Sequence, residues 1–328
     1  MATLSAEIQV WPIAGAFVIS RGAKREAVVV QATISEGGHV GRGECVPYGR
    51  YGETPEGVLG EIEKFAGSIA AGLGREELQH ALPAGAARNA LDCALWDLEA
   101  VQRGCSVADL AGFERWDTIR TAYTISLASA SEMAERAARA SAYPLLKLKL
   151  GGDGDADRMR AVRAAVPGAR LTVDANEAWS EDRIEGLLGV ARDVGVEMVE
   201  QPLPADRDKV LGELAHDVPI CADESLHTHL DVARLVRRYD VANIKLDKAG
   251  GLSEALLVME AARANGMKVM VGCMLATSLS MAPAHLLAQN ADWVDLDGPL
   301  LLARDRSPGL AYDADRVAPP GPGLWGGR

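Results

Sequence analysis

Three carboxylates in the second half of the chain stand at the ends of short apolar runs. Asp174, Glu200 and Asp223 each follow such a run at once or within two residues. If the runs are parallel strands of one sheet, their carboxyl ends meet at one edge, and the three charges repel one another unless a divalent cation lies between them. Asp174 or Asp223 alone could instead cap the following helix, and Glu200, before Pro202, could be a loop residue. The prediction of a cation site therefore depends on the joint pattern.

Lysines flank this predicted site on two further strands. Lys147 and Lys149 are two residues apart, so both point to the same face of their strand. Lys245 lies on a later strand, which places it on the opposite side of the carboxylates. A Lys-x-Lys strand by itself is usually a solvated edge. A purely structural cation has no use for two nearby positive charges, so the combination indicates catalysis.

Two other patterns suggest metal sites less well. The segment Asp153–Asp157 begins like a calcium-binding loop, but Arg158 stands where that loop needs glycine. His227 and His229 resemble half of a zinc site, which would make the protein a zinc hydrolase. No third histidine or cysteine ligand is evident, and a histidine pair at the start of a helix is the simpler interpretation.

The elements that would position these residues repeat along the chain from Thr121 onward. Eight short apolar runs alternate with stretches of helical spacing, at about 22 to 28 residues per unit, the length of a strand, a helix and two loops. This predicts a closed parallel barrel with its chemistry at the carboxyl ends of the strands; an open doubly wound sheet is the alternative. The runs are Thr121–Leu127, Leu145–Leu150, Leu171–Val173, Glu197–Val199, Val218–Cys221, Val241–Leu246, Lys268–Cys273 and Trp293–Leu296.

The N-terminal third has a different organisation. Its first forty or so residues are β-rich and include a hairpin of Ala27–Ser35 with His39–Glu44. From Thr54 to Gly112 the pattern is helical, most clearly over Ala86–Leu98. We therefore expect an α+β domain over residues 1–115 and a barrel over 116–304. The tail, about 305–328, is too rich in proline and glycine beyond Val317 for regular elements, and packing on the first domain is one option for it.

Composition narrows the classes of partner and location. The net charge of −12 argues against a nucleic-acid partner, because phosphate binding requires clustered lysine and arginine. No apolar run reaches the roughly 18 residues that span a bilayer, and the N-terminus does not have the form of a secretory signal. The five scattered cysteines suit reduced thiols. We expect a cytoplasmic protein without a membrane partner; a homo-oligomer is an option without a residue-level argument.

These motifs together resemble the enolase superfamily, in its muconate-lactonising-enzyme-like branch. The resemblance covers nearly the whole chain. A narrower similarity, to dipeptide epimerases of the L-Ala-D/L-Glu type, depends on the last strand and on two other segments. The motifs are Lys147-Leu-Lys149, Asp174-Ala-Asn176, Glu200-Gln-Pro202, Asp223-Glu-Ser225 and Ile244–Asp247, and for the narrower similarity Asp295-Leu-Asp297, Val271–Ser278 and Phe17–Gly22.

The resemblance implies a fold and a set of site residues. The fold is an α/β (β/α)7β modified TIM barrel with an N-terminal α+β capping domain over its mouth. In that family pattern, Asp174, Glu200 and Asp223 would hold Mg²⁺. Lys149 and Lys245 would be the acid/base pair on the two faces of the α-carbon, and Lys147 would add positive charge beside the enolate.

The resemblance also implies how a dipeptide would be bound. Asp295 and Asp297 would receive its ammonium group. An arginine of the loop that follows Phe17 would take the glutamate side chain, with Arg21 as first choice and Arg25 as second. We expect the loop Pro47–Glu53, including Tyr51, to lie at the substrate and exclude water; an inert glycine-rich turn is the alternative.

The function implied is Mg²⁺-dependent epimerisation of L-Ala-L-Glu and L-Ala-D-Glu by proton transfer at the glutamate α-carbon, in murein-peptide metabolism. The same metal and lysine set serves cycloisomerases, o-succinylbenzoate synthase and N-acylamino acid racemases, because fold does not determine function. A non-catalytic metal-binding barrel is a further alternative, against which the paired lysines weigh.

Overall fold

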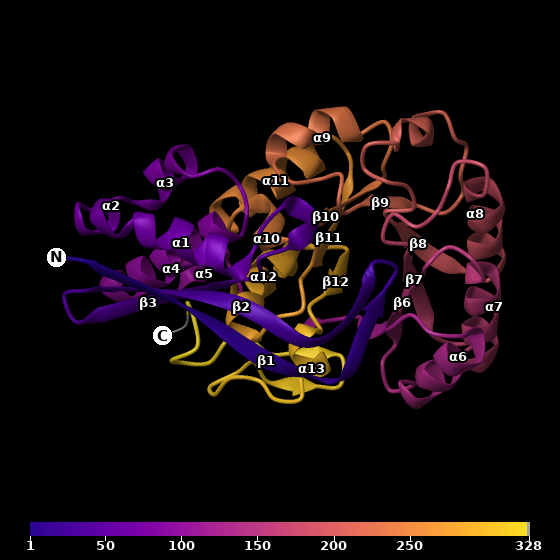
Figure 1. Cartoon of the computed structure of the whole chain (residues 1–328), viewed down its shortest axis with the longest axis horizontal. Helices are drawn as coiled ribbons and strands as arrows, with labels where there is room; N and C mark the ends of the chain where they lie inside the picture. The colour runs from indigo at the N-terminus through magenta and orange to yellow at the C-terminus, as the bar shows by residue number, and fades with distance from the viewer. Residues whose placement is uncertain (327–328) are drawn as a thin grey trace.

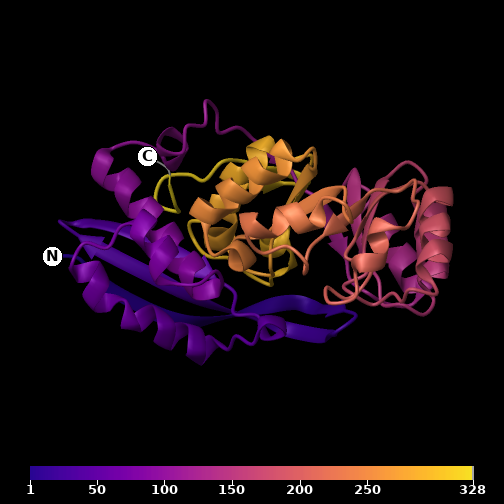
Figure 2. The ribbon, with the colours of Figure 1, turned by 90° about the horizontal axis from the view of Figure 1, so that it is seen from above.

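A three-stranded antiparallel sheet forms the N-terminal part of the computed structural model, which describes residues 1–326. Its strands β1 (Thr3–Ile19), β2 (Gly22–Glu36) and β3 (His39–Cys45) lie in that order. The predicted β2–β3 hairpin is confirmed, with Glu36 paired to His39. Strands β1 and β2 are longer than β3, and their hairpin extends beyond β3 toward the barrel (Figures 1 and 2). There the Val18 carbonyl accepts a hydrogen bond from Leu127 N (3.0 Å).

Helices cover one face of this sheet. The helix that the sequence predicted most clearly, over Ala86–Leu98, is confirmed as part of α4. Two glycines of β3 explain why α4 lies so close to the sheet. A Cβ atom at Gly41 would lie 2.2 Å from the Ala94 carbonyl oxygen, and one at Gly43 would lie 2.1 Å from that of Ala90. Only glycine therefore allows this packing. The helices are α1 (Pro55–Lys64), α2 (Ala66–Ala70), α3 (Arg75–Ala81), α4 (Ala86–Arg103) and α5 (Val107–Leu110).

Eight parallel strands form the second sheet, and each lies on one of the eight predicted apolar runs. Their order follows the sequence without a switch point, which excludes the doubly wound alternative. The Ala122 amide, just before β5, donates to the Val294 carbonyl of β12 (2.8 Å) and joins the first strand to the last. The strands are β5 (Tyr123–Ile125), β6 (Leu145–Lys149), β7 (Arg170–Asp174), β8 (Val196–Glu200), β9 (Ile220–Ala222), β10 (Val241–Ile244), β11 (Lys268–Gly272) and β12 (Trp293–Asp295).

Seven connections join these strands, which is the (β/α)7β arrangement. Helices fill six of them and surround the strands (Figures 1 and 2). The connection between β8 and β9 instead contains a short 3-10 turn, Lys209–Gly212. Apolar side chains of strands and helices form one continuous buried core. The helices are α6 (Ala130–Arg139), α7 (Asp155–Ala165), α8 (Ile184–Asp193), α9 (His229–Leu235), α10 (Leu246–Ala249), α11 (Leu252–Ala264) and α12 (Ser278–Leu287).

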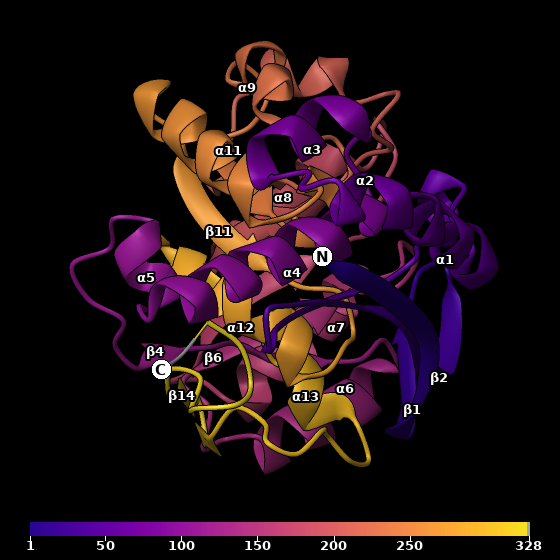
Figure 3. The ribbon, with the colours of Figure 1, turned by 90° about the vertical axis from the view of Figure 1, so that its left-hand side faces the viewer.

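The C-terminal tail returns to the N-terminal part of the molecule. After the short helix α13 (Gly298–Leu301), strand β13 (Tyr312–Asp313) pairs with β14 (Arg316–Val317), and β14 pairs with β4 (Ile119–Arg120). Beyond Val317 the described residues form no helix or strand, as predicted. Trp325 is buried and its Nε1 donates to the Cys93 carbonyl of α4 (3.0 Å), so the tail packs on that helix (Figure 3).

Across residues 1–326, no helix combines the length and apolarity that crossing a bilayer requires. All five cysteines are unpaired.

Candidate active site

The three predicted carboxylates meet at the carboxyl end of the barrel. Asp174 ends β7, Glu200 ends β8 and is its register partner, and Asp223 follows β9. All three are buried, and one oxygen from each lies within 4.8 Å of the others. Glu200 Oε2 accepts no well-aligned hydrogen bond within the described residues, and its close partner is the positive charge of Lys147 (2.7 Å). An oxygen that already faces a cation in a buried site is suited to a metal ion.

Three lysines surround the carboxylates from different strands. The Lys147 ammonium lies 2.7 Å from Glu200 Oε2 and from Asp295 Oδ2, and 3.5 Å from Asp174 Oδ2. Lys149, two residues further along β6, donates to Asp174 Oδ2 (2.6 Å). Lys245 contacts the group from the other side and donates to Asp223 Oδ2 (2.7 Å). The structure therefore brings together all six residues of the predicted metal and lysine set.

The electrostatics of this cluster are those of buried charges in mutual contact. Burial favours the neutral acid, but Lys149 and Lys147 outweigh it and lower the pKa of Asp174 to about 2. Burial and the Asp174 charge raise the pKa of Glu200 to about 7. Burial alone would lower the pKa of Lys147 and of Lys245, but the carboxylates around each of them raise it well above its usual value. Glu200 is thus the carboxylate with the least compensated charge.

The chemistry of these donors fits a hard divalent cation. Mg²⁺ and Ca²⁺ prefer oxygen ligands, whereas zinc sites contain mostly histidine and cysteine. Within the described residues, these three carboxylates are the one group of acidic, histidine or cysteine side chains arranged to hold a metal ion. A cation between them would replace Lys149 and Lys245 as the counter-charge of Asp174 and Asp223. Both lysines could then turn toward a ligand.

The calcium-like segment and the histidine pair noted in the sequence have structural roles instead. His229 starts α9 and its Nδ1 lies 2.6 Å from Glu254 Oε1, while the His227 ring packs edge-on against Tyr51 (4.6 Å between centroids). The two histidines therefore face different partners and form no zinc pair. Asp155, in the calcium-like segment, is the first residue of α7 and accepts hydrogen bonds from the Gly151 and Gly152 amides. The segment is therefore the start of a helix, and not a calcium-binding or other polar loop beyond Gly154.

A cavity of about 360 Å³ opens beside the carboxylates. Its walls come from the β1–β2 turn, the loop after β3, and the strand ends that carry Lys149, Asp223 and Lys245. Tyr51 also lines it, and burial together with the charges of Asp223 and Glu224 raises the pKa of the Tyr51 hydroxyl. The loop Pro47–Glu53 thus contributes residues 48–51 to the cavity wall.

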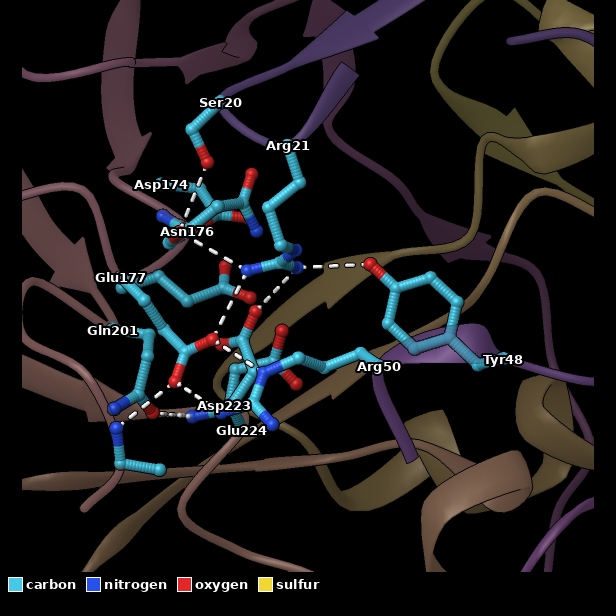
Figure 4. A network of polar contacts seen from close by, with 12 residues as sticks. Ser20, Arg21, Tyr48, Arg50, Asp174, Asn176, Glu177, Gln201, Asp223 and Glu224 are labelled. Carbon is cyan, nitrogen blue, oxygen red and sulfur yellow. Dashed lines mark hydrogen bonds and ion pairs between the residues drawn. The ribbon is translucent and has the colours of Figure 1, made fainter. Parts of the chain in front are cut away.

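Arg21 lies in this wall, but its guanidinium is already engaged (Figure 4). Nη2 donates to Glu224 Oε1 (2.7 Å) and to the Tyr48 hydroxyl (2.9 Å), and Nη1 donates to the Asn176 carbonyl (3.0 Å) and to Glu177 Oε2 (3.3 Å). Both terminal nitrogens therefore have two acceptors, and Glu224 balances the charge. Arg21 joins the cap to the barrel in this structure and has no terminal donor left for a substrate carboxylate.

Arg25, the second choice, does not line the cavity. Lys24, which precedes it on β2, does line the cavity, and side chains of successive strand residues point to opposite faces. Lys24 is the register partner of Phe17, and its ammonium lies 5.3 Å from the Tyr48 ring centroid. Within the described residues it forms no ion pair. Lys24 is therefore the cation of this wall without a carboxylate partner, and sequence reasoning missed it.

The two aspartates after β12 are both buried but differ in their partners. Asp295 is held by Lys147, as described above. Asp297 forms no ion pair within residues 1–326, and its Oδ2 accepts a hydrogen bond from the Thr124 amide (2.6 Å). Burial and the nearby Asp295 charge raise the pKa of Asp297 to about 7. Asp297 is thus the member of the pair that could accept a positively charged ligand group.

Sequence reasoning also missed two charged residues beside the three carboxylates. Glu224 directly follows Asp223, and its Oε1 accepts a hydrogen bond from Arg21 Nη2 (2.7 Å). Lys248 lies one helical turn after Lys245, and its ammonium contacts Asp223 Oδ1 (2.6 Å). The three-residue spacing from Lys245 was a usable signal, because residues at i and i+3 lie on the same side of a helical turn.

Comparison with known proteins agrees with this geometry. Residues 1–112 match the family model "Mandelate racemase / muconate lactonizing enzyme, N-terminal domain", and residues 129–324 match "Enolase C-terminal domain-like". The chain is 46% identical over 314 residues to L-Ala-D/L-Glu epimerase of Escherichia coli strain K12, covering 95% of this chain and 98% of that protein.

Two solved structures are also similar over nearly the whole chain. One is an enolase family member from Agrobacterium tumefaciens with homology to dipeptide epimerases and with bound sodium and L-Ala-L-Glu; it is 52% identical, with a TM-score of 0.98 and coverage of 99% of this chain and 100% of that one. The other is a dipeptide epimerase from Enterococcus faecalis V583 complexed with Mg and L-Leu-L-Tyr, 28% identical, with a TM-score of 0.90 and coverage of 99% and 98%. The chain therefore belongs to the mandelate racemase/muconate lactonizing enzyme family of the enolase superfamily.

Proposed function

We propose that this protein is a Mg²⁺-dependent dipeptide epimerase that interconverts L-Ala-L-Glu and L-Ala-D-Glu. The observation that carries the proposal is the pair Lys149 and Lys245, which contact the cluster of three carboxylates from opposite sides, Lys149 at Asp174 and Lys245 at Asp223. Inversion at a carbon needs one group to remove the proton and another to return it from the opposite face. The epimerase names of the relatives and the dipeptides bound in similar structures support the same reaction.

Asp174, Glu200 and Asp223 would hold the Mg²⁺ ion, and the magnesium in the E. faecalis structure supports this choice of metal. When bound, Mg²⁺ stabilises as a Lewis acid the second negative charge that develops on the substrate carboxylate when the α-proton leaves. The enolase superfamily is itself the standard example of this chemistry, since its sites combine a lysine or histidine base with magnesium.

The lysines would perform the proton transfer. Lys149 removes the α-proton from one epimer and Lys245 delivers a proton on the opposite face, with the roles exchanged in the reverse direction. Lys147 is fully buried between Glu200 and Asp295, so it stays in place and adds a fixed positive charge beside the reacting carboxylate.

The ammonium group and the glutamate side-chain carboxylate of the dipeptide would bind charged residues that have no ion-pair partner among residues 1–326. Asp297 binds the ammonium group, since Asp295 is paired with Lys147. Lys24 takes the glutamate side-chain carboxylate in place of Arg21 or Arg25, because Arg21 is neutralised by Glu224 and Arg25 lies outside the cavity. Tyr51 and the loop around it close the site against water.

Several expectations remain predictions. These are the domain division at residues 115 and 304, a cytoplasmic location, a homo-oligomer, and a role in murein-peptide metabolism. The unpaired cysteines are consistent with a reducing compartment.

The reaction is tested by incubating enzyme, Mg²⁺ and L-Ala-L-Glu in D₂O. We expect one deuterium at the glutamate α-carbon together with conversion to L-Ala-D-Glu, followed by NMR and mass spectrometry. Absence of exchange with every dipeptide tested, while Mg²⁺ is bound, would refute the proposal and favour the N-acylamino acid or cycloisomerase alternatives.

Metal binding is tested by titrating Mg²⁺ into metal-free protein in a calorimeter. We expect Glu200→Gln to lose most of the affinity, at least about tenfold, because it removes one of three charged ligands. Glu181→Gln, at an exposed carboxylate on the loop after β7, should bind as the unmodified chain does. Equal affinity of the two variants would contradict the assigned ligands.

The ammonium site predicts a pH dependence of KM for L-Ala-L-Glu. The pKa of Asp297 is raised to about 7, so the side chain becomes neutral as the pH falls below that value and attracts the ammonium group less. KM should therefore rise between pH 7.5 and 6 by up to about tenfold per unit. Asp297→Asn should have a high KM that does not change over this interval. If Asp297→Asn has the same KM as the unmodified enzyme at pH 7.5, Asp297 does not bind the ammonium group.

The choice between Lys24 and Arg21 is tested with L-Ala-L-Glu and its neutral isostere L-Ala-L-Gln. Lys24→Met should raise KM for L-Ala-L-Glu by about 10- to 100-fold, the loss expected for a charge-assisted contact, and leave L-Ala-L-Gln nearly unchanged. Arg25→Met is the matched control and should affect neither. An Arg21→Met variant that loses only the preference for glutamate would instead assign the carboxylate to Arg21.

A further inference from the structure

Lys248 is a buried lysine that contacts a proposed metal ligand but does not line the cavity. It lies in α10, the short turn of helix that follows β10. Its ammonium contacts Asp223 Oδ1 (2.6 Å), the Asn243 carbonyl (3.2 Å) and the Asp223 carbonyl. Two of its three acceptors are thus main-chain oxygens. Lys248 is held there whatever the cavity contains.

Lys245 contacts the same carboxylate on its other oxygen. Its ammonium lies 2.7 Å from Asp223 Oδ2 and 4.0 Å from Glu200 Oε1, and it lines the cavity. Both partners of Lys245 are carboxylates, with no main-chain oxygen among them. Asp223 therefore lies between Lys245, which faces the cavity, and Lys248, which main-chain oxygens hold in place.

The opposite side of the site has no equivalent arrangement. Asp174, the partner of Lys149, is instead held by neutral donors, the Asn176 amide (2.9 Å) and the Asn176 side chain (3.1 Å), besides the more distant Lys147. The main chain at Asp223 has its own anchor, since Gln201 Oε1 accepts the Asp223 amide (2.9 Å; Figure 4). A change at Lys248 thus alters the charge on Asp223 while this anchor of the strand end remains.

We propose that Lys248 is a positioning residue for one half of the reaction, an inference that rests on the proposed epimerase function. By keeping Asp223 Oδ1 neutralised, Lys248 allows Lys245 to leave Asp223 and reach the α-carbon. Without Lys248, Lys245 is the one lysine that Asp223 keeps beside the metal ion, and separating it from this buried carboxylate becomes more unfavourable. Proton transfer on the Lys245 face then fails while transfer on the Lys149 face continues.

The test measures α-proton exchange in D₂O from L-Ala-L-Glu and from L-Ala-D-Glu separately, at early times. Each lysine exchanges the α-proton of one epimer, and Lys245→Ala identifies the epimer that depends on Lys245. We expect Lys248→Met and Lys248→Gln to slow exchange of that epimer by at least about tenfold and to leave the other within about threefold. Lys248→Arg, which keeps the charge, should restore much of the rate.

Mg²⁺ affinity, measured by calorimetry, supplies a readout apart from activity. We expect Lys248→Gln to bind Mg²⁺ at least as tightly as the unmodified chain, because a positive charge beside a ligand has been removed. If Lys248→Met does not fold, as judged by circular dichroism, Lys248→Gln keeps a hydrogen-bond donor for Asp223 and carries the test alone.

Equal slowing of both epimers, together with weaker Mg²⁺ binding, would mean that Lys248 only supports the fold and would overturn the inference. Unchanged exchange in Lys248→Gln would overturn it as well. An unmodified enzyme that exchanges neither epimer would instead refute the proposed function, and the inference would fall with it.

Discussion

The mutual repulsion of three buried carboxylates is the constraint on which the site depends. Asp174, Glu200 and Asp223 each place one oxygen within 4.8 Å of the others at the end of the barrel, and such a group is stable only with positive charge around it. The protein supplies that charge from Lys147, Lys149, Lys245 and Lys248. In the proposed reaction a divalent cation would take over the role of Lys149 and Lys245, and these two lysines would then be available for proton transfer.

The four lysines are not equivalent, and their surroundings explain the difference. Lys147 and Lys248 are the most deeply buried and contact acceptors that do not depend on a ligand. Lys149 and Lys245 line the cavity, where a ligand can reach them. Fixed charges next to movable ones suit a site in which charge develops during the reaction, because preorganised groups need no rearrangement at that moment.

The cap contributes to the site through the β1–β2 turn and the loop after β3. Arg21 and Arg50 from these segments both contact Glu177, which follows β7, and Arg21 also contacts Glu224 after β9 (Figure 4). These ion pairs connect segments far apart in the sequence and hold the cap over the strand ends. They also use the charge of Arg21, which leaves Lys24 as the cation of that cavity wall without a carboxylate partner in the described part of the chain.

The sequence by itself predicted eight strands, the convergence of three carboxylates at their ends and the lysines beside them. Periodic apolar runs mark strands whatever the tertiary contacts are, and parallel strands bring their carboxyl ends together, so residues such as Asp174 and Lys245 could be assigned from position alone. Only the tertiary structure decided which charges are already neutralised. In the sequence Arg21 and Arg25 are the candidate receptors, whereas Lys24 and Lys248 do not stand out, because ion pairing depends on side chains brought together from distant segments. The contacts of Arg21 with Glu224 and of Lys248 with Asp223 are therefore properties of the folded chain.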